Sequence, residues 1–172
     1  MATLHHNISG ELIQELIAAG EDARASSISL TNVQKVSKCK VDLYIEKSLT
    51  GKFYLLKGVE LPIGTSLMYN NPKFSNTSNA FGLYVELTDG DTFTLTGSIN
   101  PTGTNTAVPG TNTLFLSELS IGDEILVSGE TRIIDGITSD TAATVSVAWG
   151  SDLANDTTPD CNPTALVDVI IN

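Results

Sequence analysis

The stretch that decides the fold is Ala165-Leu166-Val167-Asp168-Val169-Ile170-Ile171-Asn172, the last residues of the sequence. A run of branched apolar residues around a single acid is typical of a β-strand. Residues 88–164, which precede it, differ in character, and the apolar segments that could pair with it lie before them. We therefore interpret this stretch as the last strand of a domain that begins near Ser26 and is interrupted, and we predict that it pairs with strands from before residue 88.

This interpretation divides the 172-residue chain into three parts. Residues 1–25 form an N-terminal arm with a short helix. Residues 26–87 plus 165–172 form an immunoglobulin-like antiparallel β-sandwich that serves as an anchoring domain, because short strands separated by turns favour such a sandwich. Residues 88–164 form an inserted, acidic small β module that resembles a barrel. The predicted fold class is all-β.

The predicted helix begins after Ser9, a residue type favoured at helix N-caps. Its apolar stripe has helical spacing and consists of Leu12, Ile13, Leu16 and Ile17. A helix of about three turns is marginal alone, so we expect this stripe to dock on the sandwich of the same chain or on a neighbouring subunit.

Tyr44 is a further candidate for partner docking. It alternates with Leu43 and Ile45 in a period-two strand pattern, which places its ring on the opposite face from those two residues. A ring on that face can be partly exposed or enter an interface, which makes Tyr44 a docking candidate, but the favoured interpretation is ordinary sandwich packing with the hydroxyl at the rim.

The inserted module shows short apolar segments joined by Gly- and Asp-containing turns. We expect strands at residues 92–99, 114–116, 124–128, 131–134 and 144–149. The core of the module is predicted to contain Ile125, Val127, Ile133, Ile137, Val145, Val147 and Trp149.

Charge excludes some partners. The formal net charge is −11, and residues 1–73 contain eight of the nine basic residues, whereas residues 74–172 contain one basic and thirteen acidic residues. Non-specific nucleic-acid binding requires clustered Lys and Arg, so we expect no nucleic-acid partner. The sequence contains no secretory signal and no apolar run of about 20 residues, so we expect no membrane partner.

The residue inventory argues against an enzyme. Two histidines, both near the start, leave a Ser-His-Asp triad without a base, and Cys39 has no placed histidine partner. Asp123 and Glu124 are neighbours that would point to opposite faces of a strand, so we interpret them as solvated turn acids. The sequence therefore predicts no catalytic residue and no cofactor.

An oxygen-rich loop near the end contains candidate metal ligands. Such loops can hold calcium, and this one carries Asp152, Asp156 and Asp160. The spacing differs from that of an EF-hand loop, so the favoured interpretation is a polar loop without a metal.

Two groups of segments resemble tailed-bacteriophage virion proteins. Residues 111–125, 130–132 and 137–141 are similar to a small β module that recurs in phage tail, fibre and decoration proteins. Residues 30–32, 41–45, 53–59 and 61–65 resemble virion structural proteins of large marine and cyanobacterial phages, in which a similar sandwich runs directly into a final Val-Asp-Val-Ile-Ile strand. The matching positions are turn and core residues, so no functional residue is carried over.

The resemblance implies a non-enzymatic structural component of a phage virion, a decoration or accessory protein on the capsid surface or at the neck or tail. Its partners would be other virion proteins, its copies multiple or homo-oligomeric, and its location the virion, after assembly in the host cytoplasm. The alternative is a tail-fibre adhesin module that binds a host surface or a glycan.

Overall fold

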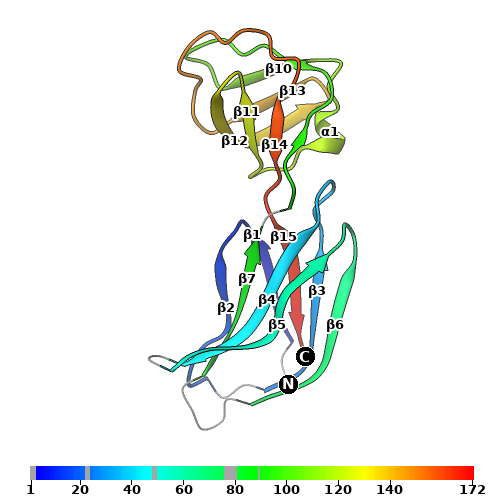
Figure 1. Cartoon of the computed structure of the whole chain (residues 1–172), viewed down its shortest axis with the longest axis vertical. Coiled ribbons are helices and arrows are strands. Elements are labelled where there is room, and N and C mark those ends of the chain that lie inside the picture. Colours follow the sequence, from blue (N-terminus) through cyan, green and yellow to red (C-terminus); the bar gives the residue numbers. More distant parts are fainter. Residues whose placement is uncertain (1–2, 22–23, 48–49, 76–80, 89) are drawn as a thin grey trace. The chain divides into compact units, whose positions relative to one another are not determined.

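The computed structural model describes residues 3–21, 24–47, 50–75, 81–88 and 90–172. In these ranges the chain forms fifteen β-strands and one four-residue α-helix, and all strand pairs are antiparallel (Figure 1). The protein is therefore all-β, as predicted. No helix in the described ranges is long and apolar enough to cross a membrane.

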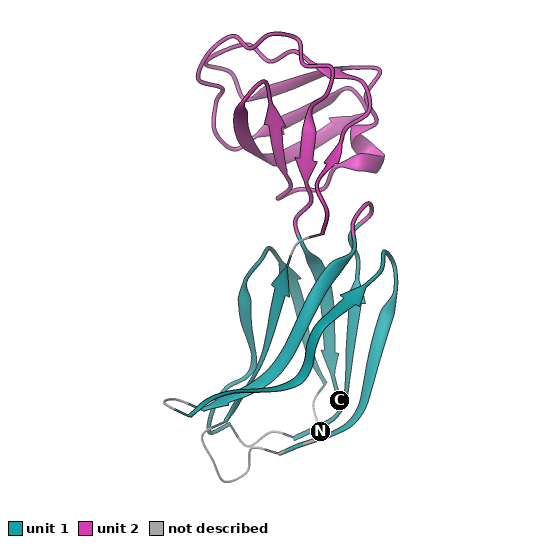
Figure 2. Cartoon of the chain, viewed as in Figure 1, with its two compact units in different colours: residues 1–34, 38–89, 165–172 teal, residues 35–37, 90–164 magenta. Residues whose placement is uncertain are grey.

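The chain divides into two compact units (Figure 2). Unit 1 comprises residues 1–34, 38–89 and 165–172, and unit 2 comprises residues 35–37 and 90–164. Each unit has its own cluster of buried apolar side chains.

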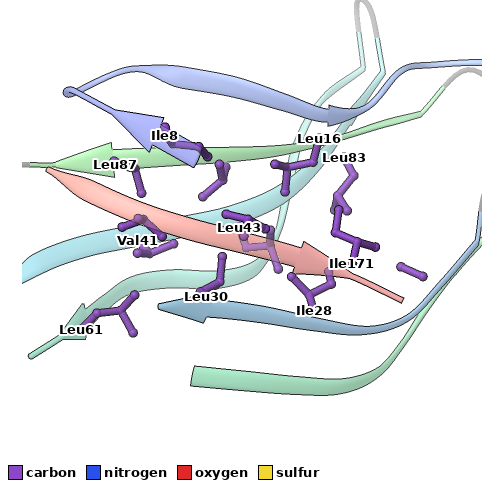
Figure 3. Close-up of a cluster of buried hydrophobic side chains, with 14 of the residues drawn as sticks. Ile8, Leu16, Ile28, Leu30, Val41, Leu43, Leu61, Leu83, Leu87 and Ile171 are labelled. Carbon is purple, nitrogen blue, oxygen red and sulfur yellow. The ribbon is translucent and has the colours of Figure 1, made fainter. Parts of the chain in front are cut away.

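Unit 1 contains eight strands in two four-stranded sheets. They are β1 (Leu4–Ser9), β2 (Ile13–Ile17), β3 (Arg24–Asn32), β4 (Cys39–Lys47), β5 (Gly51–Leu61), β6 (Ser66–Ser75), β7 (Gly82–Thr88) and β15 (Leu166–Ile171). One sheet has the order β1-β15-β3-β6 and the other has the order β2-β7-β4-β5. Apolar side chains of both sheets, among them Ile8, Leu43 and Ile171, form one core (Figure 3).

The final strand lies between two strands from the start of the chain. β15 pairs with β1, where Ile8 lies opposite Val167, and with β3, where Leu30 lies opposite Val169. Alternate residues of β15 enter the core, because Val167, Val169 and Ile171 are buried. The predicted pairing of this strand with strands from before residue 88 is therefore confirmed.

The order of the strands is that of a jelly roll. Counted within unit 1, the first strand pairs with the eighth, the second with the seventh, the third with the sixth and the fourth with the fifth. This pairing defines the double-sheet jelly roll. The predicted immunoglobulin-like strand order is therefore wrong, since that order is built from seven strands with a different arrangement.

The predicted N-terminal helix is also wrong, because residues 4–9 and 13–17 are strands of unit 1. Gly10, with φ of +107°, turns the chain from one sheet to the other, and its N–H donates to the carbonyl of Ala165 at 2.9 Å. The pairing of β2 with β7 shifts register between Glu15 and Ile17, so that Leu16 and Ile17 are both buried. This bulge reproduces the apolar spacing of a helix.

Unit 2 is a single seven-stranded sheet of order β8-β14-β11-β12-β13-β10-β9. Its elements are β8 (Phe93–Thr94), β9 (Ser98–Ile99), β10 (Ala107–Thr111), α1 (Phe115–Glu118), β11 (Glu124–Val127), β12 (Glu130–Ser139), β13 (Ala142–Val145) and β14 (Asp160–Asn162). The two edge strands, β8 and β9, are separated by only residues 95–97, so one turn joins the two edges of the sheet.

Several local predictions for unit 2 need correction. Residues 92–99 form two short strands rather than one, because Gly97, with φ of +84°, turns the chain. Residues 114–116 lead into helix α1 instead of a strand. Residues 144–149 are not one strand, since β13 ends at Val145.

The predicted core of unit 2 is correct for four of its seven residues. Ile125, Val127, Val145 and Trp149 are buried, and Ile137 packs against the core while half-buried. Ile133 and Val147 are exposed, so their assignment to the core is wrong. Ile133 lies opposite the exposed Glu124, whereas its neighbour Ile134 lies opposite the buried Val145 and enters the core.

Candidate functional site

The outer face of the β2-β7-β4-β5 sheet carries a row of polar and aromatic side chains. The strand registers place Glu15 opposite Tyr84, Tyr84 opposite Tyr44, and Tyr44 opposite Tyr54, so that one residue from each strand contributes. We call Tyr84, Tyr44 and Tyr54 the tyrosine row.

The rings of the tyrosine row pack against one another. Tyr44 and Tyr84 are stacked, with ring centroids 5.6 Å apart and an interplanar angle of 16°. Tyr44 and Tyr54 are also 5.6 Å apart, tilted by 56°. A Cβ atom at Gly82 would lie only 2.7 Å from Cε2 of Tyr84, so the glycine leaves room for this ring. The rings of the tyrosine row are thus packed closely against one another, and the Tyr84 ring also packs against the backbone at Gly82.

Charged side chains cover the tyrosine row. The Lys52 ammonium lies 4.3 Å from the centroid of the Tyr44 ring and 2.8 Å from Oε2 of Glu86. The Lys57 ammonium lies 4.5 Å from the centroid of Tyr54. Cations over aromatic faces are attracted by the ring quadrupole, so Lys52 links β5 to β4 and β7, whereas the Lys57 contact lies within β5.

The ionisation of these groups follows from the same contacts. The hydrogen bond to Glu86 raises the pKa of Lys52 above its usual range, so the ammonium remains charged. The Tyr84 hydroxyl donates to Oε1 of Glu15 at 2.8 Å, and this bond raises the pKa of Tyr84 to about 12. Burial raises the pKa of Tyr44. Tyr44 and Tyr84 are therefore neutral near pH 7.

Tyr44 is fully buried, with 0% of its surface exposed. Its assignment as a docking candidate, with a ring that is partly exposed or enters an interface, is therefore wrong, because Tyr54, Tyr84 and Lys52 cover it. A sugar-binding platform needs an open ring face. In this row the faces of Tyr44 are occupied by neighbouring rings and an ammonium. The arrangement therefore favours a role in holding the strands together over a role as a glycan-binding platform.

The remaining predicted docking residues separate into two pairs. Leu16 and Ile17 are buried in the core of unit 1 and are not available to a partner. Leu12 and Ile13 are 39% and 53% exposed, beside strand β7. They border a groove whose lining is completed by Glu11, Glu86, Leu87 and Thr88. β2 is an edge strand, with β7 as its neighbour in the sheet. We call this feature the β2 edge.

The three candidate calcium ligands of unit 2 serve separate hydrogen bonds. The Gly103 N–H donates to Oδ1 of Asp152 at 2.7 Å, and the Ser128 N–H donates to Oδ2 of Asp156 at 2.6 Å. Asp160 accepts from the Thr94 hydroxyl at 2.8 Å. Among the described residues, no three His, Cys, Asp or Glu side chains are grouped as metal ligands would be.

Asp123 has surroundings that differ from those predicted from the sequence. Its carboxylate is fully buried, so its interpretation as a solvated turn acid is wrong. Oδ2 accepts from the Ser120 N–H at 2.7 Å, and Oδ1 accepts from the Thr164 N–H at 2.8 Å. The carboxylate thus joins the turn before β11 to the last residue of unit 2. A Ser three residues before an Asp within a turn is a weak sign of such a contact.

Both cysteines are buried and neither forms a disulfide, Cys39 in unit 1 and Cys161 in unit 2. The Cys161 sulfur lies 4.0 Å from Oδ2 of Asp123. Burial raises the pKa of the Cys161 thiol well above its usual range. The negative charge of Asp123 raises this pKa further, by a smaller amount. A thiol held in its protonated form is a poor nucleophile, so the surroundings of Cys161 do not favour nucleophilic chemistry.

Comparison with protein-family models, curated proteins and solved structures found no match for this chain.

Proposed function

We propose that the protein is a non-enzymatic structural component of a tailed-phage virion, a decoration or accessory protein on the capsid surface or at the neck or tail. In this proposal unit 1 is the anchoring domain and unit 2 is an inserted module that is displayed. The partners are capsid or tail proteins, the protein is present in many copies, and assembly takes place in the host cytoplasm.

The observation that carries the proposal is the position of β15. This strand completes unit 1 between β1 and β3, although residues 90–164 separate it from β7. The chain thus leaves the jelly roll after its seventh strand and returns to form its eighth. A module inserted in this way can vary or be lost without removing a strand of the anchor, which suits a display function.

The distribution of charge supports different surroundings for the two units. Unit 2 carries ten acidic and two basic residues, whereas unit 1 carries ten acidic and seven basic residues. Strong self-repulsion keeps a module soluble and discourages unwanted association. The more balanced unit 1 is better suited to contact a protein surface, and many copies would allow weak individual contacts to hold through multivalency.

The polar groups with the most unusual surroundings support a structural role. Asp123 uses its carboxylate to hold two backbone N–H groups, and the tyrosine row joins four strands through ring packing, an ion pair and a hydrogen bond. Both arrangements hold segments of one unit together, which is what a structural component requires.

The proposal is tested by locating the protein in purified particles of the virus that encodes it. Quantitative mass spectrometry of gradient-purified particles should find this chain at many copies per particle, and antibodies raised against it should label the particles in electron micrographs. A chain found in infected cells but absent from washed, purified particles would refute the proposal.

A further inference from the structure

β2 is the less protected edge of its sheet. The opposite edge strand, β5, carries Lys52 and Lys57, and its pairing with β4 is interrupted by register shifts beside Gly58. Charged side chains and bulges of this kind discourage strand addition. The sequence of β2, Ile-Gln-Glu-Leu-Ile, contains neither lysine nor proline, and its first residue is more than half exposed. Its pairing with β7 shifts register only after Glu15, so residues 13–15 form a regular edge.

The outer face of β2 specifies what a further strand would meet. Ile13 lies opposite Glu86 of β7, and Glu15 lies opposite Tyr84. Residues two apart in a strand share a face, and residues directly opposite in neighbouring strands interact. A strand added beyond β2 would therefore place one side chain beside Ile13 and another, two residues away, beside Glu15.

The charges along this edge select a basic strand. Glu15 is exposed and Glu86 is half-buried, and both carboxylates lie on the outer face, where Lys52 is paired with Glu86. A second copy of the chain would bring the Glu15 carboxylates of both copies to one seam, and like charges in neighbouring strands are destabilising. A strand carrying lysine or arginine would instead be attracted.

We propose that the β2 edge binds an extended segment of another virion protein as an additional strand. The segment carries an apolar side chain beside Ile13, above the groove that Leu12 and Leu87 help to line, and a lysine or arginine beside Glu15. Main-chain hydrogen bonds to the edge provide affinity, and the two side chains provide selectivity. The identity of the partner as a virion protein rests on the proposed function, whereas the chemistry of the segment rests on the edge alone.

The test is a titration of the full-length, isotopically labelled chain followed by NMR. The probes are two synthetic peptides that differ at one position, acetyl-Thr-Lys-Thr-Val-Thr-amide and acetyl-Thr-Glu-Thr-Val-Thr-amide. In an antiparallel pairing each can place its valine beside Ile13 and its charged residue, two positions away on the same face, beside Glu15. The basic peptide should shift the amide signals of residues 12–17 and slow their hydrogen exchange, and the acidic peptide should bind at least about tenfold more weakly. Glu15→Gln should weaken binding of the basic peptide by about threefold, the size expected for one exposed ion pair.

Glu60→Gln is the matched control, because this substitution removes the same charge. Glu60 is exposed and lies on β5, at the far edge of the same sheet. Glu15→Gln retains an oxygen that can accept from the Tyr84 hydroxyl, so unit 1 should remain folded. Equal binding of both peptides, signal changes confined to other strands, or no change at several millimolar peptide would each overturn the proposal. Absence of the chain from virions would refute the proposed function without altering the outcome of this titration.

Discussion

Replacing Asp123 with alanine should destabilise unit 2 by about 4 kcal/mol. The buried carboxylate accepts two backbone N–H groups, from Ser120 at 2.7 Å and from Thr164 at 2.8 Å. A hydrogen bond to a charged group contributes about 1.5–3 kcal/mol, and alanine would leave both donors without this acceptor in a buried site. We take a value in the lower half of the combined range, because water can enter the space that the side chain leaves.

Asp123→Asn should cost less, about 2 kcal/mol, because the amide keeps one acceptor and presents N–H to one of the two donors. The control is Glu124→Ala, which removes the same charge from the next residue. Glu124 is exposed, so its replacement should change stability by less than about 0.5 kcal/mol.

Trp149 provides an assay that is specific for unit 2. It is the only tryptophan of the chain and is buried in the core of this unit. Its fluorescence, followed during urea and thermal unfolding, should show a midpoint about 15–30 °C lower for Asp123→Ala, by the usual scaling for a domain of about 60–100 residues. A loss below about 1 kcal/mol, or a loss equal to that of Glu124→Ala, would show that the buried carboxylate does not hold the turn and the end of the unit together.

Three further predictions concern unit 1. Gly82→Ala should cost about 1–3 kcal/mol in urea unfolding, because the new Cβ would lie 2.7 Å from a ring atom of Tyr84; unchanged stability would mean that the ring moves freely. Folding raises the pKa of Tyr84 from 10.0 to about 12, so the stability that its protonated hydroxyl provides is complete below pH 10 and is lost between pH 10 and 12. Tyr84→Phe should remove this part of the pH dependence. Unfolding midpoints measured across this pH range report the stability, and ultraviolet titration reports the ionisation of the tyrosine. Deleting residues 90–164 and joining the ends with a short linker should leave a cooperatively melting β-protein by circular dichroism, and an unfolded product would argue against an independent anchor.

The terminal strand could be predicted because its signal is local and strong. Val167, Val169 and Ile171 repeat with the period of a strand, and this period agrees with the face that enters the core. The alternation of Val41 and Leu43 in β4 is equally clear. In such segments the propensity of each residue, the periodicity and the tertiary burial all favour the same structure.

The N-terminal strands could not be predicted from periodicity, because a bulge changes it. Leu12, Ile13, Leu16 and Ile17 have the spacing of a helical stripe, but the register shift after Glu15 turns two consecutive residues into the core. Without these two strands the sequence predicts six or seven strands for the domain rather than eight, and that number favours an immunoglobulin-like order over a jelly roll. One local irregularity therefore led to the wrong topology.

The misjudged side chains share a physical cause, since their burial depends on residues that are distant in sequence. Tyr44 points away from the core as its strand pattern requires, yet rings from β5 and β7 and the Lys52 stem cover it on the outer face. Asp123 lies in a turn, where acids are usually solvated. Its carboxylate is instead buried and accepts a hydrogen bond from the N–H of Thr164, which is distant in sequence. A period-two pattern specifies which face a side chain occupies, and only the neighbouring strands determine whether that face is open. The same reasoning explains why Ile13 is exposed: it lies on the outer face of an edge strand, and no strand among the described residues lies beyond it.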